Sequence, residues 1–267
     1  MQRPSPRNRI LNRDPANPKV STQVANWLNV VNPLDYKPSL WLDASDTTTI
    51  TESSGSVSQW NDKSGNDFHL SQGTSANQPV TGTRTINGLN VLDFNSGTSD
   101  VLTRATASQL VNSATGGFTA FAVWQADTTS GIGGVISQDA VSGTRMPQMI
   151  RRDTTNVQTV RVAGGVFVDN AGVTVTTATT FVTASQHRIN DIEAWGNGSS
   201  NGATATTGSN GTIAALIRVG AASATASAFF DGVIAEIIVI PRNLTNLEMN
   251  KIGDYLVRKW AGSWAVS

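Results

Sequence analysis

The run from Phe229 to Ile240, FFDGVIAEIIVI, constrains the fold of this chain more than any other stretch. In a half-buried strand one of the two alternating faces is polar, yet here the residues of both parities are almost all apolar. Such a strand needs cover on both sides. The chain supplies one cover directly, because Thr245 and Glu248 have the spacing of a helix-capping box and an apolar stripe at helical spacing accompanies them. That stripe consists of Leu247, Ile252, Tyr255, Leu256 and Trp260. We therefore predict a helix near 245–260 on one face of the strand and a second sheet on the other.

The chain between residues 39 and 240 is a series of short runs rich in Val, Ile, Phe, Trp and Thr, each bounded by Gly, Asn, Asp or Ser. About a dozen such runs alternate with turns, which favours a two-sheet antiparallel sandwich over alternating strands and helices. Charged residues make up only 14% of the chain, as expected for a sandwich with long polar loops. Residues 196–211 are nearly all Gly, Asn, Ser, Ala and Thr, and we expect an exposed loop or an edge hairpin there.

The first 38 residues differ from the rest. They hold six basic and two acidic side chains, a net charge of +4 in a chain whose total is zero, and four prolines lie among the first twenty residues. This composition predicts an extended basic arm. A stripe of Val24, Trp27, Leu28 and Val31 predicts a short helix near 21–31 within it. We therefore divide the chain into an arm, residues 1–38, and a sandwich, residues 39–267.

Two blocks at opposite ends of the sandwich resemble a known family. The opening block is LWLDASD at 40–46 with VSQWNDKSGN at 57–66, and the closing block runs from FDG at 230–232 through AEIIV to the LTxxE of the helix. Both are similar to the ends of concanavalin A-like, laminin-G-like jelly-roll domains of bacterial and phage surface proteins. The resemblance implies two curved antiparallel sheets, with the Phe229 strand inside and the helix on its outer side. It does not select a function, because this family includes lectins, glycosidases, adhesins and structural modules.

The glutamates give little support for glycoside hydrolysis, which requires two carboxyl groups at a fixed separation. The chain has only Glu52, Glu193, Glu236 and Glu248, and the Glu-x-Asp-x-Glu run of the glycosidases in this superfamily is missing. Glu248 is explained by helix capping, and Glu52 lies in a polar stretch where solvation is expected. Glu236 shares its parity with two isoleucines, so we predict a buried structural carboxylate bonded to backbone or to an arginine, with acid or base chemistry as the alternative.

Other chemistries are also poorly supported. The two histidines have no G-x-S-x-G partner for a serine triad, and a chain without cysteine has no thiolate for zinc or for catalysis. Calcium stays open as an alternative at Asp43, Asp46 and Asp62, although Asp residues in such loops more often form turns. We predict no other cofactor.

Trp195, at the edge of the polar loop and near Asn197, is the best candidate for a sugar-stacking platform. Core packing is nevertheless the favoured interpretation of Trp195, as for the other tryptophans within apolar strands.

These observations favour a non-enzymatic structural protein, a phage capsid decoration or accessory virion surface protein. In this interpretation the arm fastens the sandwich to other virion proteins, such as the major capsid protein, through Arg3, Arg7, Arg9, Arg13 and Trp27. The alternative is a glycan-binding module of a tail or adhesin protein that binds cell-surface glycans. A polysaccharide-degrading enzyme is the least favoured of the three.

Localisation follows from what the chain lacks. No apolar stretch suits a secretory signal or a membrane span, so we expect synthesis in the host cytoplasm, assembly into a virion and no membrane partner. Nucleic acid is disfavoured as a partner, because the arginines of the arm alternate with prolines and lack aromatic neighbours. Association into homo-oligomers is left open.

Overall fold

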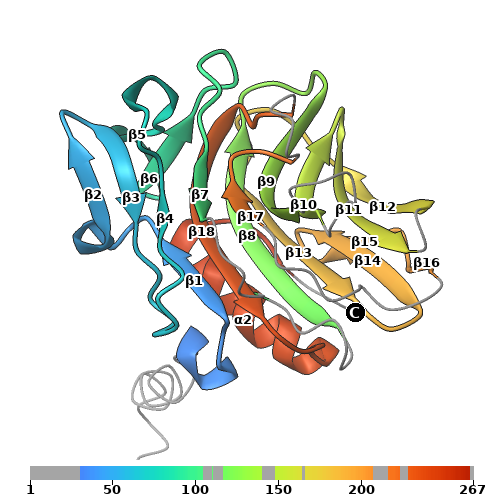
Figure 1. Ribbon diagram of the computed structural model, residues 1–267. Coiled ribbons are helices and arrows are strands. Elements are labelled where there is room, and N and C mark those ends of the chain that lie inside the picture. The colour runs from blue at the N-terminus through green and yellow to red at the C-terminus, as the bar shows by residue number, and fades with distance from the viewer. Residues whose placement is uncertain are drawn as a thin grey trace, which may run out of the picture. The chain divides into compact units, whose positions relative to one another are not determined.

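The computed structural model describes residues 31–104, 110, 117–139, 148–163, 166–206, 216–222 and 228–264. In these ranges the chain forms eighteen strands, one α-helix and three short 3-10 helices, and every strand pairing is antiparallel (Figure 1). The first nine strands are β1 Leu40–Asp43, β2 Ile50–Ser53, β3 Ser56–Trp60, β4 Leu70–Ser71, β5 Val80–Ile86, β6 Leu89–Phe94, β7 Leu102–Arg104, β8 Phe118–Ala126 and β9 Ile132–Asp139. The others are β10 Gln148–Asp153, β11 Asn156–Ala163, β12 Val166–Thr174, β13 Phe181–His187, β14 Asp191–Gly196, β15 Ser199–Ser200, β16 Thr204–Ala205, β17 Leu216–Val219 and β18 Gly232–Ile240. The helices are α2 Asn246–Trp260 and the 3-10 turns η1 Pro33–Tyr36, η2 Thr47–Thr49 and η3 Ser75–Asn77.

Two layers of strands enclose the core. In the first layer β1 and β6 pair with different parts of β18, and β8, β13 and β14 follow in order. The second layer runs β4, β7, β17, β9, β10, β11, β12, and β3 joins the layers at one edge by pairing with both β4 and β5. Across the core β12 faces β14, and β10 faces β8 and β13. The predicted all-β antiparallel sandwich of the jelly-roll type is confirmed.

The two-faced strand and its covering helix are also confirmed. All nine residues of β18 are buried, with β1 and β8 beside it and α2 along its outer face (Figure 1). The helix begins at the N-cap Thr245, whose hydroxyl accepts the backbone N–H of Glu248 at 3.3 Å while the Glu248 carboxylate accepts the backbone N–H of Thr245 at 2.9 Å. The prediction is wrong for one residue of the apolar stripe. Leu247 is 66% exposed, because the first turn presents Met249 to the sheet instead.

The Asn- and Gly-rich stretch forms a hairpin at the edge of the first layer, where β14 pairs with both β15 and β16. Two asparagine side chains tie this hairpin to β12 of the second layer. The Asn170 amide donates to the Gly202 carbonyl at 2.7 Å and accepts the backbone N–H of Ala194 at 2.8 Å. The Asn201 amide donates to the Gly172 carbonyl at 2.9 Å. Among the described strands no backbone ladder joins the layers at this edge, and side-chain amides close it instead.

Residues 1–30, which include most of the predicted arm and helix, lie outside the described residues, as do residues 207–211 of the polar stretch. The compact unit that contains the sandwich begins at Asn32. Among the described helices none has the length and apolarity needed to cross a bilayer.

Candidate functional site

Glu236 is the centre of a polar cluster inside the molecule. It lies on β18, its side chain is fully buried, and its carboxylate accepts four hydrogen bonds from side chains. Two come from the indole nitrogens of Trp41 and Trp260, both at 2.7 Å, and two from the Tyr255 hydroxyl and the Lys259 ammonium, both at 2.8 Å. The predicted burial of Glu236 is therefore observed, but its cation is a lysine of α2 rather than an arginine, and no backbone bond contributes among the described residues.

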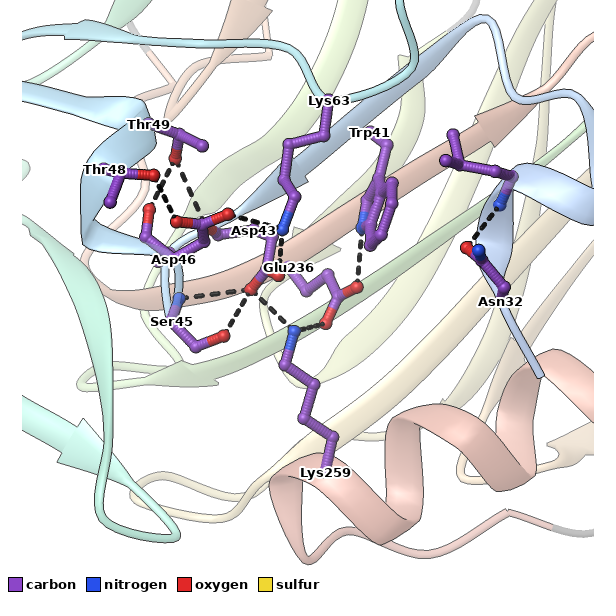
Figure 2. Close-up of polar contacts among 12 residues, drawn as sticks. Asn32, Trp41, Asp43, Ser45, Asp46, Thr48, Thr49, Lys63, Glu236 and Lys259 are labelled. Carbon is purple, nitrogen blue, oxygen red and sulfur yellow. Dashed lines mark hydrogen bonds and ion pairs between the residues drawn. The ribbon is translucent and has the colours of Figure 1, made fainter. Parts of the chain in front are cut away.

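A chain of alternating charges extends from this carboxylate to the surface. Lys259 also lies 2.6 Å from Asp43 Oδ1, Lys63 lies 3.0 Å from Asp43 Oδ2, and Lys63 reaches Asp46 at 2.8 Å. Figure 2 shows the two lysines approaching the Asp43 carboxylate from opposite sides. We call Glu236, Asp43, Lys259 and their three aromatic partners the Glu236 clamp, because they join β1, β18 and α2.

The protonation states in the clamp follow from its surroundings. Burial raises the pKa of Glu236, and the Lys259 ammonium opposes this shift. Burial also disfavours the charged form of Asp43, but Lys259 and hydrogen bonds from Ser45 and Lys63 outweigh it and hold the pKa of Asp43 below its usual value. Burial and the nearby Glu236 carboxylate raise the pKa of Tyr255, which keeps its hydroxyl a donor. The clamp is thus internally satisfied and serves to hold α2 on the sheet.

The same contacts account for the three aspartates considered for calcium. Asp43 and Asp46 bind Lys63 between them, so an ammonium occupies the position that a cation would take (Figure 2). The Asp62 carboxylate accepts the backbone N–H groups of Trp41, Ser64 and Phe68 at 2.9, 2.9 and 3.1 Å. Aspartate side chains commonly stabilise turns through such bonds to the backbone. Within the described ranges no three carboxylate or histidine side chains are grouped to hold a metal.

The residues considered for sugar stacking are engaged elsewhere. The Trp195 indole on β14 is 4% exposed, and the guanidinium of Arg188 lies over its ring, 5.6 Å from the centroid. Asn197 adopts a left-handed conformation with φ 53°, and its side-chain oxygen accepts the backbone N–H of Val182 at 3.0 Å. Burial of Trp195 agrees with core packing and leaves no open ring face. The arm residues Arg3, Arg7, Arg9, Arg13 and Trp27 lie outside the described residues.

A second polar cluster, not anticipated from the sequence, lies on the outer face of the second layer. Val157 on β11 belongs to the core, so its neighbour Gln158 points outward. The Gln158 amide accepts from Arg151 Nε at 2.8 Å and donates to Asp169 at 3.0 Å, and Arg151 also donates to Asp153 at 2.9 Å. We call Asp153, Arg151, Gln158 and Asp169 the outer ladder, since it crosses β10, β11 and β12.

The outer ladder has accessible ends and an ordered middle. The Asp153 side chain is 28% exposed and Asp169 is exposed, whereas the Arg151 side chain is 13% exposed and Gln158 is 7% exposed. Arg151 and Gln158 therefore fix the directions of two carboxylates that face solvent. The apolar alternation of β11 can be found in the sequence, whereas Asp169, Asn170 and Gly172 interrupt the apolar pattern of β12.

No protein-family model matches this chain, and no curated protein sequence matches it. Solved structures match by fold. The binding domain of botulinum neurotoxin serotype G has a TM-score of 0.60 at 10% identity, over 84% of this chain and 54% of that one. Domain 4 of an extracellular GH43 arabinanase from Geobacillus stearothermophilus, solved with arabinotriose, has a TM-score of 0.58 at 10% identity, over 82% of this chain and 97% of that one.

A Trypanosoma rangeli sialidase in complex with sialic acid also matches, with a TM-score of 0.58 at 12% identity, over 91% of this chain and 39% of that one. The chain thus spans about half of the toxin binding domain, under half of the sialidase and nearly all of the arabinanase domain. At these identities the likeness is one of fold. It defines the class as an antiparallel β-sandwich similar to domains found in toxins and glycan-processing enzymes, and it assigns no family.

Proposed function

We propose that this chain is a non-catalytic module that binds glycans. The observation that carries the proposal is the outer ladder, where carboxylate, guanidinium and amide groups cross three neighbouring strands of one sheet face. Sugars are recognised by polar groups of these types held in fixed directions. The fold likeness supports the same class, since the arabinanase domain was solved with arabinotriose and the sialidase with sialic acid.

The glutamates support a binding role over a hydrolytic one. Glu236 is enclosed by four donors, Glu248 caps α2, and Glu193 binds Arg188 at 2.9 Å. Glu52 accepts the backbone N–H of Gly55 at 2.6 Å in an exposed turn. Each carboxylate thus has a structural partner, whereas glycoside hydrolysis uses a pair that faces the scissile bond across an open site.

The outer ladder suits hydroxyl recognition because its accessible atoms are acceptors. The carboxylates of Asp153 and Asp169 are accessible to solvent, and Arg151 and Gln158 hold them in place through 2.9 and 3.0 Å bonds. The second oxygen of Asp153 also accepts the Thr154 hydroxyl at 3.1 Å. Preorientation of this kind lowers the entropy that is lost when a flexible ligand binds. We therefore assign sugar-hydroxyl contacts to the two aspartates and positioning to Arg151 and Gln158.

The test is a glycan array probed with the labelled protein, followed by titration of the positive ligands. Asp153→Asn and Asp169→Asn should each weaken binding about tenfold or more, as expected for the loss of a charged acceptor. Asp254→Asn is the matched control, because Asp254 is exposed on α2 against the other layer. Binding that is absent from the array, or unchanged in both ladder variants, contradicts the proposal.

The arm supports a second proposal, that the module is fastened to a larger assembly such as a phage particle. Its support is the +4 charge of residues 1–38 against −4 in the remainder, together with four prolines among the first twenty residues, a composition that predicts an extended arm. A variant lacking residues 1–30 retains Asn32, whose side chain caps η1. It should fold like the full chain and fail to join the assembly. Incorporation of the truncated protein at the full-length level contradicts the anchoring role.

A further inference from the structure

The Glu236 clamp brings together the three groups that an amide bond between two side chains requires. Lys259 Nζ lies 2.6 Å from Asp43 Oδ1 and 2.8 Å from Glu236 Oε2, so one amine contacts two carboxyl groups. Because a carboxyl C–O bond is about 1.2 Å long, this nitrogen lies within about 4 Å of the Asp43 carboxyl carbon. Reactants that the fold holds this close need no encounter step, which strongly accelerates their reaction.

Burial favours the neutral forms of these groups. The side chains of Glu236, Asp43 and Lys259 are 0%, 5% and 17% exposed. Burial raises the pKa of Glu236, which makes this carboxylate the one suited to take a proton from the ammonium. Lys63 and Asp46 are the contrasting pair, since they lie 2.8 Å apart with side chains that are 22% and 33% exposed. Water competes for that pair and keeps it ionic.

The aromatic side chains of the clamp fix the direction of the Glu236 carboxylate. Trp260 donates to Oε2 at 2.7 Å, and Trp41 and Tyr255 donate to Oε1 at 2.7 and 2.8 Å. These bonds hold Oε2 toward Lys259. Asp43 is the direct cross-strand partner of Glu236, and such partners have their Cβ atoms only about 4.5–5.5 Å apart on one face of the sheet. A proton on Glu236 is therefore close to the Asp43 carboxyl group.

We propose that Asp43 and Lys259 form an intramolecular isopeptide bond, with Glu236 transferring the protons. Glu236 takes a proton from the Lys259 ammonium, and the neutral amine attacks the Asp43 carboxyl carbon to form the new C–N bond. Lys63, 3.0 Å from Asp43 Oδ2 on the opposite side of the carboxylate, stabilises the negative charge on that oxygen (Figure 2). Glu236 passes its proton, and then a second one from the nitrogen, to Oδ1, whose bond to carbon breaks as water leaves.

The step is balanced without a further reactant. One ammonium and one carboxylate become one amide and one water, Glu236 returns to its starting state, and no group is oxidised or reduced. The bond joins residues 216 positions apart and links β1 to α2, so it encloses nearly the whole sandwich in a covalent loop. A chain without cysteine thereby gains the covalent closure that a disulfide gives other domains.

Mass spectrometry of the denatured full chain tests the bond. The natural chain should be lighter by about 18 Da, one water, than its sequence requires. Trypsin should no longer cleave after Lys259, and fragmentation should identify a branched peptide that joins Asp43 to Lys259. Lys259→Arg is the reference, because its guanidinium keeps the positive charge but is always protonated and does not attack a carboxyl group. After allowance for the substitution itself, this variant should lack the mass loss. Asp46→Asn, which alters the neighbouring exposed pair, should retain it.

Glu236→Gln tests the proton transfer. In a time course after cell-free synthesis, this variant should form the bond about a hundredfold more slowly than the natural chain. Circular dichroism identifies the folded fraction, to which the comparison is restricted. The inference is overturned if the natural chain has the full mass of its sequence, if the lost water maps to other residues, or if Lys259→Arg shows the same mass loss. A folded Glu236→Gln chain that forms the bond at the natural rate overturns the role of Glu236.

Discussion

Asp43 and Glu236 are direct cross-strand partners in β1 and β18, and their buried carboxylates share the ammonium of Lys259, at 2.6 and 2.8 Å. Like charges placed opposite each other on adjacent strands repel, and burial strengthens the repulsion. The Lys259 ammonium between the two carboxylates offsets this repulsion. Because that cation comes from α2, the first sheet layer and the helix depend on each other for stability.

Lys259→Met should be strongly destabilising. The variant keeps most of the side-chain volume but leaves two buried carboxylates without their shared cation, and breaking a buried pair in this way costs about 3–5 kcal/mol. Urea unfolding followed by circular dichroism measures the free energy of unfolding. Lys251→Met, on the exposed face of the same helix, should change it by less than about 0.5 kcal/mol. Equal effects of the two substitutions would show that the Glu236 clamp does not contribute to the free energy of unfolding.

Removing one negative charge should partly rescue that defect. In the Lys259→Met background, Glu236→Gln eliminates the cross-strand repulsion, and its single amide oxygen keeps one of the two indole bonds, which Trp41 and Trp260 make to different carboxylate oxygens. The double variant should therefore be more stable than Lys259→Met alone, with a coupling of about 1–3 kcal/mol in a double-mutant cycle. Additive effects of the two substitutions contradict direct coupling of Glu236 and Lys259.

Glu248, in the first turn of α2, should make the free energy of unfolding depend on pH under acidic conditions. Hydrogen bonds from Arg242 and from the Thr245 backbone lower the pKa of Glu248 from 4.5 to about 2. A depressed folded-state pKa contributes stability that is present above the unfolded value and is lost as pH falls toward about 2. The difference in urea midpoint between the natural chain and Glu248→Gln should thus shrink between pH 5 and about pH 2. A difference that stays constant over this range contradicts the capping role.

Local signals accounted for most of the fold. The two-faced β18, the capping box and many of the other strands follow from apolar periodicity and turn residues, which act over a few positions. The partners of Glu236 could not be found in this way, because parity predicts that the side chain is buried but not which cation reaches it. That choice depends on the register of β1 against β18 and on the rotation of α2.

The edge of the sandwich should open when Asn170 is shortened. Asn170→Ala removes bonds to Gly202, Thr204 and Ala194 and leaves their polar groups to find water, at a cost of about 2–4 kcal/mol. Hydrogen exchange should increase in β15 and β16 before it increases in β18, because these short strands depend on β14 and Asn170 for attachment. Unchanged exchange in 199–206 would show that the amide does not close this edge.

Substitutions at Trp195 distinguish core packing of its indole from sugar stacking. Buried at 4% exposure beneath Arg188, it should behave as a core residue, so Trp195→Ala should cost about 3–5 kcal/mol from lost packing and the cavity left behind. Trp195→Phe keeps most of that packing, and its glycan affinity per folded molecule should match the natural chain. The measurements are urea unfolding and titration with the glycans that the array identifies. If Trp195→Phe stays folded but loses glycan binding, the indole contacts the sugar after Arg188 moves aside, and the outer ladder is not the primary site.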